Sequence, residues 1–160
     1  MSNDQKYPQV EMIEWKYHPD YIRLDTTKND DWYIYLFRYL KKYINKILEG
    51  WSVKDFFENI PVDKLAVYTD TVFTDVLVGD LKRSAKEPIC VSDKKFEIEE
   101  NDENVCFLPP STLFEKYKAG KISKIIVCGM FHENEIMDFL LTMGFELDDV
   151  ITLSTILLQD

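Results

Sequence analysis

An apolar run, a polar turn and an amphipathic segment follow one another in residues 64–84, KLAVYTDTVFTDVLVGDLKRS. The run LAVY is apolar throughout, which is typical of a strand buried on both faces of a parallel sheet. Apolar residues recur at helical spacing after the turn. Those expected to face inward are Val72, Val76, Leu77 and Leu81. A buried strand joined by a short turn to a helix predicts the first unit of a βαβ crossover.

The same alternation continues to the end of the chain. Four more apolar runs predict strands: PICVSD, VCFLPP, KIIVCG and DVITL. Helical segments follow the last three: STLFEKYKAG, which we expect Ser111 to cap and Gly120 to end, then ENEIMDFLLTMG and a final turn, STILLQD. The segment KKFEIEENDEN reads as a charged loop. Strands that alternate with helices in this way imply a parallel sheet. We therefore expect a small Rossmann-like α/β domain of about five strands over residues 61–160.

A helical segment over residues 31–60 is expected to precede this domain, behind an irregular N-terminal arm, residues 1–30. Apolar residues recur at steps of three and four from Trp32 to Ile47, and Gly50 is placed to end the helix. Ser52 is expected to cap a second, short helix. The aromatic excess on the first helix has two interpretations: extra packing onto the domain, or an interface with a protein partner or a second copy. The candidate interface residues are Trp32, Leu36, Tyr39 and Tyr43.

Charge and composition exclude several classes of protein. A formal net charge of −10 argues against binding to nucleic acid or to anionic membrane surfaces, since both attract basic proteins. No apolar run is long enough to span a membrane, and the N-terminus lacks an apolar signal core, so we expect a cytoplasmic protein. Cys90, Cys106 and Cys128 lie in apolar runs without metal-ligand spacing. They are expected to be free thiols in the core of a protein without bound metal.

The turn after the first strand lies where dinucleotide-binding folds carry three glycines. Thr69, Thr71 and Thr74 occupy those positions, and Asp93 falls where an acidic residue binds the ribose. Because β-branched residues are disfavoured at positive φ, we expect a turn of a different shape from the glycine turn. Asp70 or Thr71 is placed to cap the helix, and a carboxylate there would repel a phosphate. We therefore expect no resident cofactor, with a nucleotide or nucleotide sugar as the alternative.

A hydroxyl-rich turn can still bind a neutral or sugar-like group. In open α/β sheets, ligands bind where the loops after the first and fourth strands meet. The fourth strand is followed by CGMFHENE, in which Gly129 permits a close approach of the backbone and His132 is a candidate acid or base. His132 also fits a helix cap or a solvated position at the loop rim. The ligand-binding candidates are Thr69, Asp70, Thr71, Asp93, Gly129 and His132. No catalytic motif of a known class occurs, which favours a protein that is not an enzyme.

From Trp51 onward, the order of the segments WSVKDFFENI, KLAVYTDTVFTDVLVGDLKRS, CVSD, SKIIVCGMFHENEIMDFLLTMGF and DVITLSTILL resembles a family of bacterial Rossmann-like domains. That family occurs in surface-polysaccharide and glycan biosynthesis, alone or attached to glycosyltransferases. The resemblance implies a role near nucleotide-sugar or glycan assembly, as an accessory to a transferase. The chain departs from the family pattern at the three threonines, which implies a degenerate copy of the nucleotide loop.

Three functional hypotheses follow. The first is a non-catalytic Rossmann-like module of bacterial glycan biosynthesis that acts by protein contact or by weak binding of a small ligand. The second is an enzyme that binds a nucleotide sugar or S-adenosyl methionine at the strand ends, with Asp93 on the ribose and His132 near the chemistry. The third is an acidic binding protein that neutralises a toxin, which the net charge and the small size favour.

Overall fold

The computed structural model describes residues 29–129 and 132–158, with side chains from Leu36 onward. A six-stranded sheet forms its centre, in the order β3-β4-β2-β1-β5-β6. The strands are β1 (Leu65–Tyr68), β2 (Ile89–Ser92), β3 (Glu100–Asn101), β4 (Val105–Leu108), β5 (Lys124–Val127) and β6 (Val150–Thr152). All neighbours pair in parallel except β3, which runs antiparallel to β4. The predicted α/β fold and its five parallel strands are confirmed.

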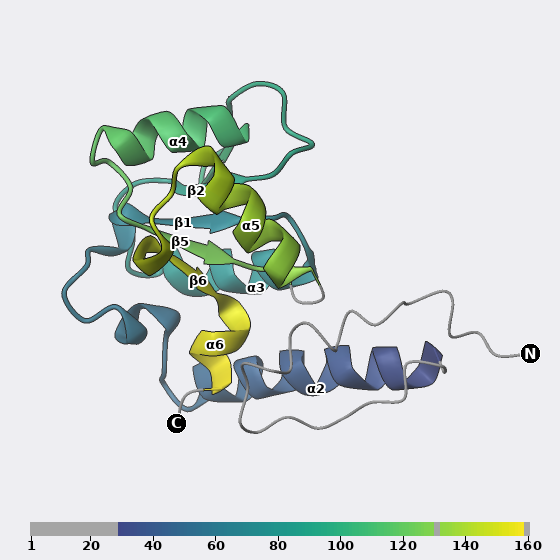
Figure 1. Ribbon diagram of the computed structural model, residues 1–160. Coiled ribbons are helices and arrows are strands. Elements are labelled where there is room, and N and C mark those ends of the chain that lie inside the picture. Colours follow the sequence, from purple (N-terminus) through teal and green to yellow (C-terminus); the bar gives the residue numbers. More distant parts are fainter. Residues whose placement is uncertain (1–28, 130–131, 159–160) are drawn as a thin grey trace, which may run out of the picture.

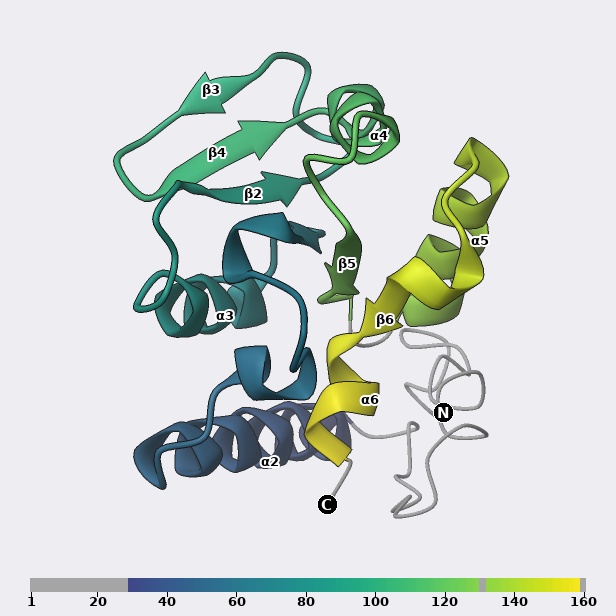
Figure 2. The same ribbon diagram turned by 90° about the vertical axis from the view of Figure 1, so that its left-hand side faces the viewer.

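Helices cover both faces of the sheet, as Figures 1 and 2 show. The helices α4 (Pro110–Lys118) and α5 (Glu133–Met143) lie on one face. On the other lie α3 (Val72–Leu81) and α6 (Leu153–Leu158), with α2 (Asn29–Leu48) packed outside them. Three short 3-10 turns complete the described elements: η2 (Val53–Phe56), η3 (Val62–Lys64) and η4 (Leu147–Asp149).

Successive residues of β1 enter opposite layers of the core. Leu65 and Val67 pack on the side of α2 and α3, whereas Ala66 and Tyr68 pack on the side of α4 and α5. All four side chains are buried, because a central parallel strand has helices on both of its faces. The continuous apolar run in the sequence is the direct consequence of this position.

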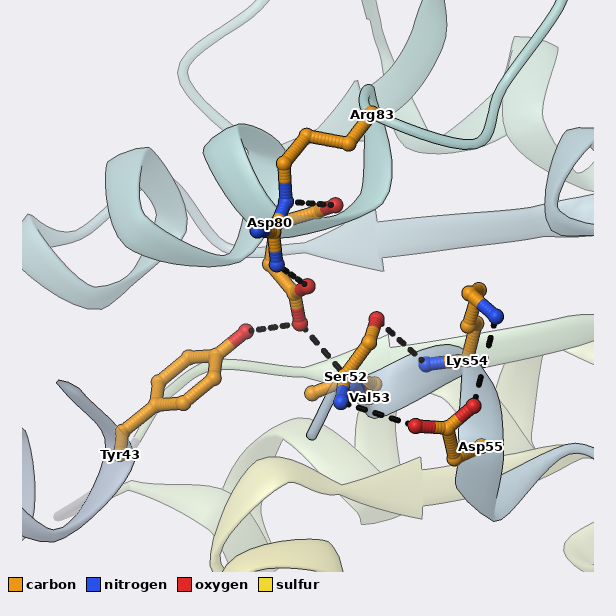
Figure 3. Close-up of polar contacts among 7 residues, drawn as sticks. All are labelled: Tyr43, Ser52, Val53, Lys54, Asp55, Asp80 and Arg83. Carbon is orange, nitrogen blue, oxygen red and sulfur yellow. Dashed lines mark hydrogen bonds and ion pairs between the residues drawn. The ribbon is translucent and has the colours of Figure 1, made fainter. Parts of the chain in front are cut away.

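A buried carboxylate attaches α2 and η2 to the sheet domain (Figure 3). Asp80, on α3, accepts hydrogen bonds from the Tyr43 hydroxyl at 3.0 Å and from the Val53 amide at 2.8 Å. Its other oxygen pairs with the Arg83 guanidinium at 3.0 Å. Burial, followed by the nearby Asp80 carboxylate, raises the pKa of Tyr43, so its hydroxyl stays protonated and donates. One side chain thereby links three elements that are far apart in the sequence.

Three local expectations are corrected by the structure. Val72 is 61% exposed, and the inward position in the first turn of α3 belongs to the buried Phe73. The helix α4 begins at Pro110, and its N-cap is Pro109, two residues before the expected cap Ser111. The charged segment after β2 is not entirely loop, since it contains the edge strand β3. Ser52 does cap the short turn that follows α2, in a capping box with Asp55.

Candidate functional site

The candidate site lies at the carboxyl ends of β1 and β5, the two central strands. The chain leaves β1 toward β2 on one side of it, whereas β5 lies on its other side and leads to β6. This reversal is the point at which open α/β sheets bind ligands. The described parts of the two loops there are residues 69–71 after β1, and residues 128–129 and 132 after β5.

Thr69 takes the backbone conformation that glycine would take. Its φ of 72° is the only positive φ of a non-glycine residue in the described part of the chain. The expectation that threonine would avoid this conformation was therefore wrong. Three hydrogen bonds hold the strained residue: its amide donates to the Ser92 carbonyl at 2.9 Å, its hydroxyl donates to the Tyr68 carbonyl at 2.6 Å, and its carbonyl accepts from the Thr74 hydroxyl at 2.7 Å. Surrounding contacts of this kind can outweigh the roughly 1–2 kcal/mol that a left-handed residue costs.

The other two threonines close the turn. Thr71 is the N-cap residue of α3 by position, and its amide donates to the Thr74 hydroxyl at 2.9 Å. The Thr71 hydroxyl donates across the crevice to the carbonyl of Cys128 at 3.1 Å, which ties the loop after β1 to the end of β5. The space between the two loops, where a ligand would lie, is therefore bridged by a side chain of the protein.

Both carboxylate oxygens of Asp93 accept hydrogen bonds from nearby backbone amides. Its Oδ2 accepts from the Asp70 amide at 2.9 Å and its Oδ1 accepts from the Lys95 amide at 3.1 Å. The Lys95 ammonium pairs with the Asp70 carboxylate at 2.6 Å, and this bond raises the pKa of Lys95. The sequence placed Thr69, Asp70, Thr71 and Asp93 at one site, and the structure brings them together. Each binds another part of the chain.

The three backbone amides of the turn before α3 already have acceptors within the chain. The amides of residues 69, 70 and 71 donate to Ser92, Asp93 and Thr74. A cleft of about 460 Å³ opens beside α3, and its lining includes the carboxylates of Asp70, Asp75 and Asp102 against the single cation of Lys82. Carboxylates at a helix start occupy the favourable position that a phosphate would need.

The loop after β5 holds a buried acid. Glu133, the first residue of α5, is 3% exposed, and its Oε2 accepts a hydrogen bond from the Ser154 hydroxyl at 2.5 Å. Its Oε1 has no partner among the described residues. Burial raises the pKa of Glu133 to about 8. It also raises the pKa of the neighbouring Cys128 thiol, which keeps that sulfur a poor nucleophile. Sequence analysis did not single out Glu133, because an acid in the first turn of a predicted helix is common and nothing local shows that this one is buried.

His132 and Gly129 do not join the network of the first loop. His132 is the N-cap residue of α5, its side chain is 58% exposed, and its Nδ1 lies 3.7 Å from Glu135. No described contact links it to Asp93 or to the threonines. The close approach at Gly129 is to the protein itself, because an added Cβ would lie 2.2 Å from the Ile136 Cδ1 atom. The helix-cap alternative for His132 matches its position.

Two buried hydroxyls lie beneath the site on the side of α4 and α5. Tyr68 and Ser92 are direct neighbours at the ends of β1 and β2, and they are 1% and 0% exposed. Neither hydroxyl has a hydrogen-bond partner among the described residues. Burial, and then the nearby Asp93, raises the pKa of Tyr68. Phe139 packs on the Tyr68 ring, and the Lys94 ammonium lies 4.0 Å from the centre of the Phe139 ring.

The predicted interface on α2 needs correction. Tyr39 and Tyr43 are buried in the chain's own core and therefore are not available to a partner, and Leu36 is partly buried against the same core. The side chain of Trp32 lies outside the described residues. The exposed apolar residues of α2 are instead Phe37, Ile44 and Leu48. Ile44 belongs to the apolar series that recurs between Trp32 and Ile47, yet it is exposed, because periodicity alone does not show which edge of the series faces the core.

Comparison of the chain with protein-family models, with curated proteins and with solved structures finds no match. Within residues 29–129 and 132–158, no group of three or more His, Cys, Asp or Glu side chains is arranged to hold a metal ion. None of the described helices is both long and apolar enough to cross a membrane. Cys106 and Cys128 are buried, Cys90 is half-buried, and all three are free thiols.

Proposed function

We propose that this chain is a non-catalytic Rossmann-like module that acts by protein contact, in the setting of bacterial glycan biosynthesis. The setting rests on the sequence pattern alone. The non-catalytic role is supported by one observation above all: the turn that would bind a phosphate is bonded to its own chain. The Thr71 hydroxyl bridges to Cys128, and the amides of residues 69–71 are all engaged.

Reopening this site for a nucleotide would be costly. A phosphate would have to displace Asp93 from the Asp70 amide and Thr74 from the Thr71 amide, leaving the two side chains to find new partners. The phosphate would also approach the negative charge of Asp70. The ion pair between Asp70 and Lys95 neutralises that charge only in part. Nucleotide-dependent catalysis of the kind that the second hypothesis requires therefore has no support in the geometry.

Thermal denaturation with a panel of nucleotides, nucleotide sugars and S-adenosyl methionine tests this proposal. A ligand present at about 100 times its Kd would add about 2.7 kcal/mol, or on the order of 5–10 °C in Tm for a chain of this size. We expect no such shift. A nucleotide-dependent shift that is lost in Asp93→Asn, but kept in the control Asp138→Asn at an exposed position of α5, would overturn the proposal.

The buried, unpartnered hydroxyls of Tyr68 and Ser92 favour a second candidate function, weak binding of a small hydroxylated ligand. Buried hydroxyls without partners are costly, and a ligand hydroxyl that reached either of them would satisfy it. The same thermal screen with free sugars and polyols tests it. A shift that Ser92→Ala abolishes supports this candidate, and a flat screen rejects it.

A further inference from the structure

The face of α2 that points away from the core carries a stripe of apolar and basic side chains. We call Phe37, Lys41, Ile44 and Leu48 the outer stripe. Their spacing of four, three and four places them on one side of the helix, opposite the buried Tyr39 and Tyr43. Phe37 is 70% exposed, Ile44 40% and Leu48 78%. Three exposed apolar side chains on one side of a helix differ from the single exposed apolar residues that are normal on a surface.

Charge on this helix runs against that of the whole chain. From Trp32 to Leu48 there are four basic residues and no acidic one, whereas the chain as a whole has 29 acidic and 19 basic residues. Arg38 and Lys41 are exposed, and neither has an acidic partner among the side chains that the structure describes. A basic patch on an acidic molecule attracts acidic partners and orients them on approach.

We propose that the outer stripe binds an amphipathic helix with acidic flanks, supplied by a partner protein. This inference rests on the proposed function, action by protein contact, and names the chemistry of the partner. A partner helix can lay its own apolar ridge along Phe37, Ile44 and Leu48, as helices do when they pack in grooves. Acidic residues on its flanks would then lie against Arg38 and Lys41. The Asp80 hydrogen bonds to Tyr43 and Val53 hold α2 and η2 rigidly, so the stripe is presented preformed.

Three other occupants fit the stripe less well. A symmetric contact between two copies would bring two identical helices into one interface, and from Trp32 to Leu48 each carries four basic residues and no acidic one. Like charges gathered in one interface are costly. An anionic membrane would repel the acidic remainder of the chain. Residues 1–28, which directly precede α2, contain five acidic and four basic residues and so lack the acidic excess that would match the stripe.

Fluorescence anisotropy of two synthetic peptides on the full chain tests the proposal. Each peptide is an amphipathic helix of about 20 residues, with leucine on one face and either glutamate or lysine on its flanks. We expect the glutamate peptide to bind at least about tenfold more tightly than the lysine peptide at low salt, and salt to reduce this difference. Lys41→Glu and Leu48→Ser should each weaken binding about fivefold or more, as hot-spot residues do. The matched controls Lys82→Glu and Leu147→Ser, both exposed on other elements, should leave it unchanged.

Equal binding of the two peptides, no binding, or binding that survives Lys41→Glu and Leu48→Ser would overturn the inference. A photo-crosslinker in place of Phe37 then identifies the occupant: a crosslink to the glutamate peptide supports it. A crosslink to residues 1–28 or to a second copy overturns it, as does flotation with anionic vesicles that Leu48→Ser abolishes. A second-copy crosslink would leave the proposed action by protein contact standing. A nucleotide-dependent thermal shift would remove the proposed non-catalytic role without affecting the peptide result.

Discussion

Replacing Asp80 by alanine should lower the free energy of unfolding by about 3–5 kcal/mol, because it strands two buried donors. The Tyr43 side chain is fully buried, and its hydroxyl would lose the carboxylate acceptor at 3.0 Å. The Val53 amide would lose its acceptor at 2.8 Å in an equally buried place. Each stranded donor costs about 1–3 kcal/mol. The pair with Arg83 adds little, since that side chain is 56% exposed and well solvated.

Urea denaturation followed by circular dichroism measures this loss. Tyr43→Phe removes one of the two donors together with its bond and should cost only about 1 kcal/mol. Asp75→Ala changes an exposed acid on the same helix and should stay within about 1 kcal/mol of the parent protein. If Asp80→Ala is no more destabilising than Asp75→Ala, the carboxylate does not hold α2 and η2 to the sheet, and the argument for a preformed outer stripe fails with it.

Three further predictions concern the site and the helix ends. Burial raises the pKa of Glu133 from 4.5 to about 8, so between these pH values the folded state keeps a proton that the unfolded chain releases. The free energy of unfolding should therefore fall by roughly 3 kcal/mol from pH 5 to pH 8. Urea titrations across that range measure this slope, and Glu133→Gln should flatten it. Thr69→Val keeps the strained backbone but loses the hydroxyl hydrogen bond, so it should cost about 1 kcal/mol of stability. Thr69→Gly relieves the backbone strain and should be less destabilising than Thr69→Val. A lower Tm for Thr69→Gly than for Thr69→Val would show that residue 69 is not strained. Gly79→Ala lies inside α3 with nothing near the added Cβ, so it should stabilise the fold by about 0.5–1 kcal/mol. Gly144 has a φ of 115°, and an added Cβ would lie 3.0 Å from Phe114, so Gly144→Ala should destabilise the fold by about 1 kcal/mol or more. Equal effects of the two variants in chemical denaturation would refute this contrast.

The central strands β1 and β5 could be predicted because both of their faces are covered, which requires a continuous apolar run in the sequence. The edge strand β3 is exposed and has no such run. The side of α3 that faces the core could not be predicted in its first turn. The periodic pattern accepts either Val72 or Phe73 as the first inward residue, and the choice depends on where the helix begins. That start is fixed by bonds of Thr71 to Thr74 and to the distant Cys128, which no local pattern contains.

The same limit explains why Asp80 was missed. An acidic residue on an amphipathic helix is normally predicted to face solvent. Only the groups that contact Asp80 in the folded chain show that it is buried. Tyr43 lies 37 positions before it and Val53 lies 27 before it. The positive φ of Thr69 is also a tertiary effect, because Ser92 and Thr74 hold the residue where its own preference would not.

The three threonines do more than occupy the positions at which dinucleotide-binding folds carry glycines. In a glycine-rich turn, backbone amides point toward a ligand and stay unpaired without it. Here the Thr74 hydroxyl and the Asp93 carboxylate supply the acceptors that phosphate oxygens would supply, and the Thr71 hydroxyl spans the gap between the two central strands. The three backbone amides of the turn therefore have acceptors within the chain itself. A Rossmann-like domain whose turn is bonded to its own chain can serve as a rigid support for a binding surface. The most distinctive surface of this domain is the outer stripe of α2.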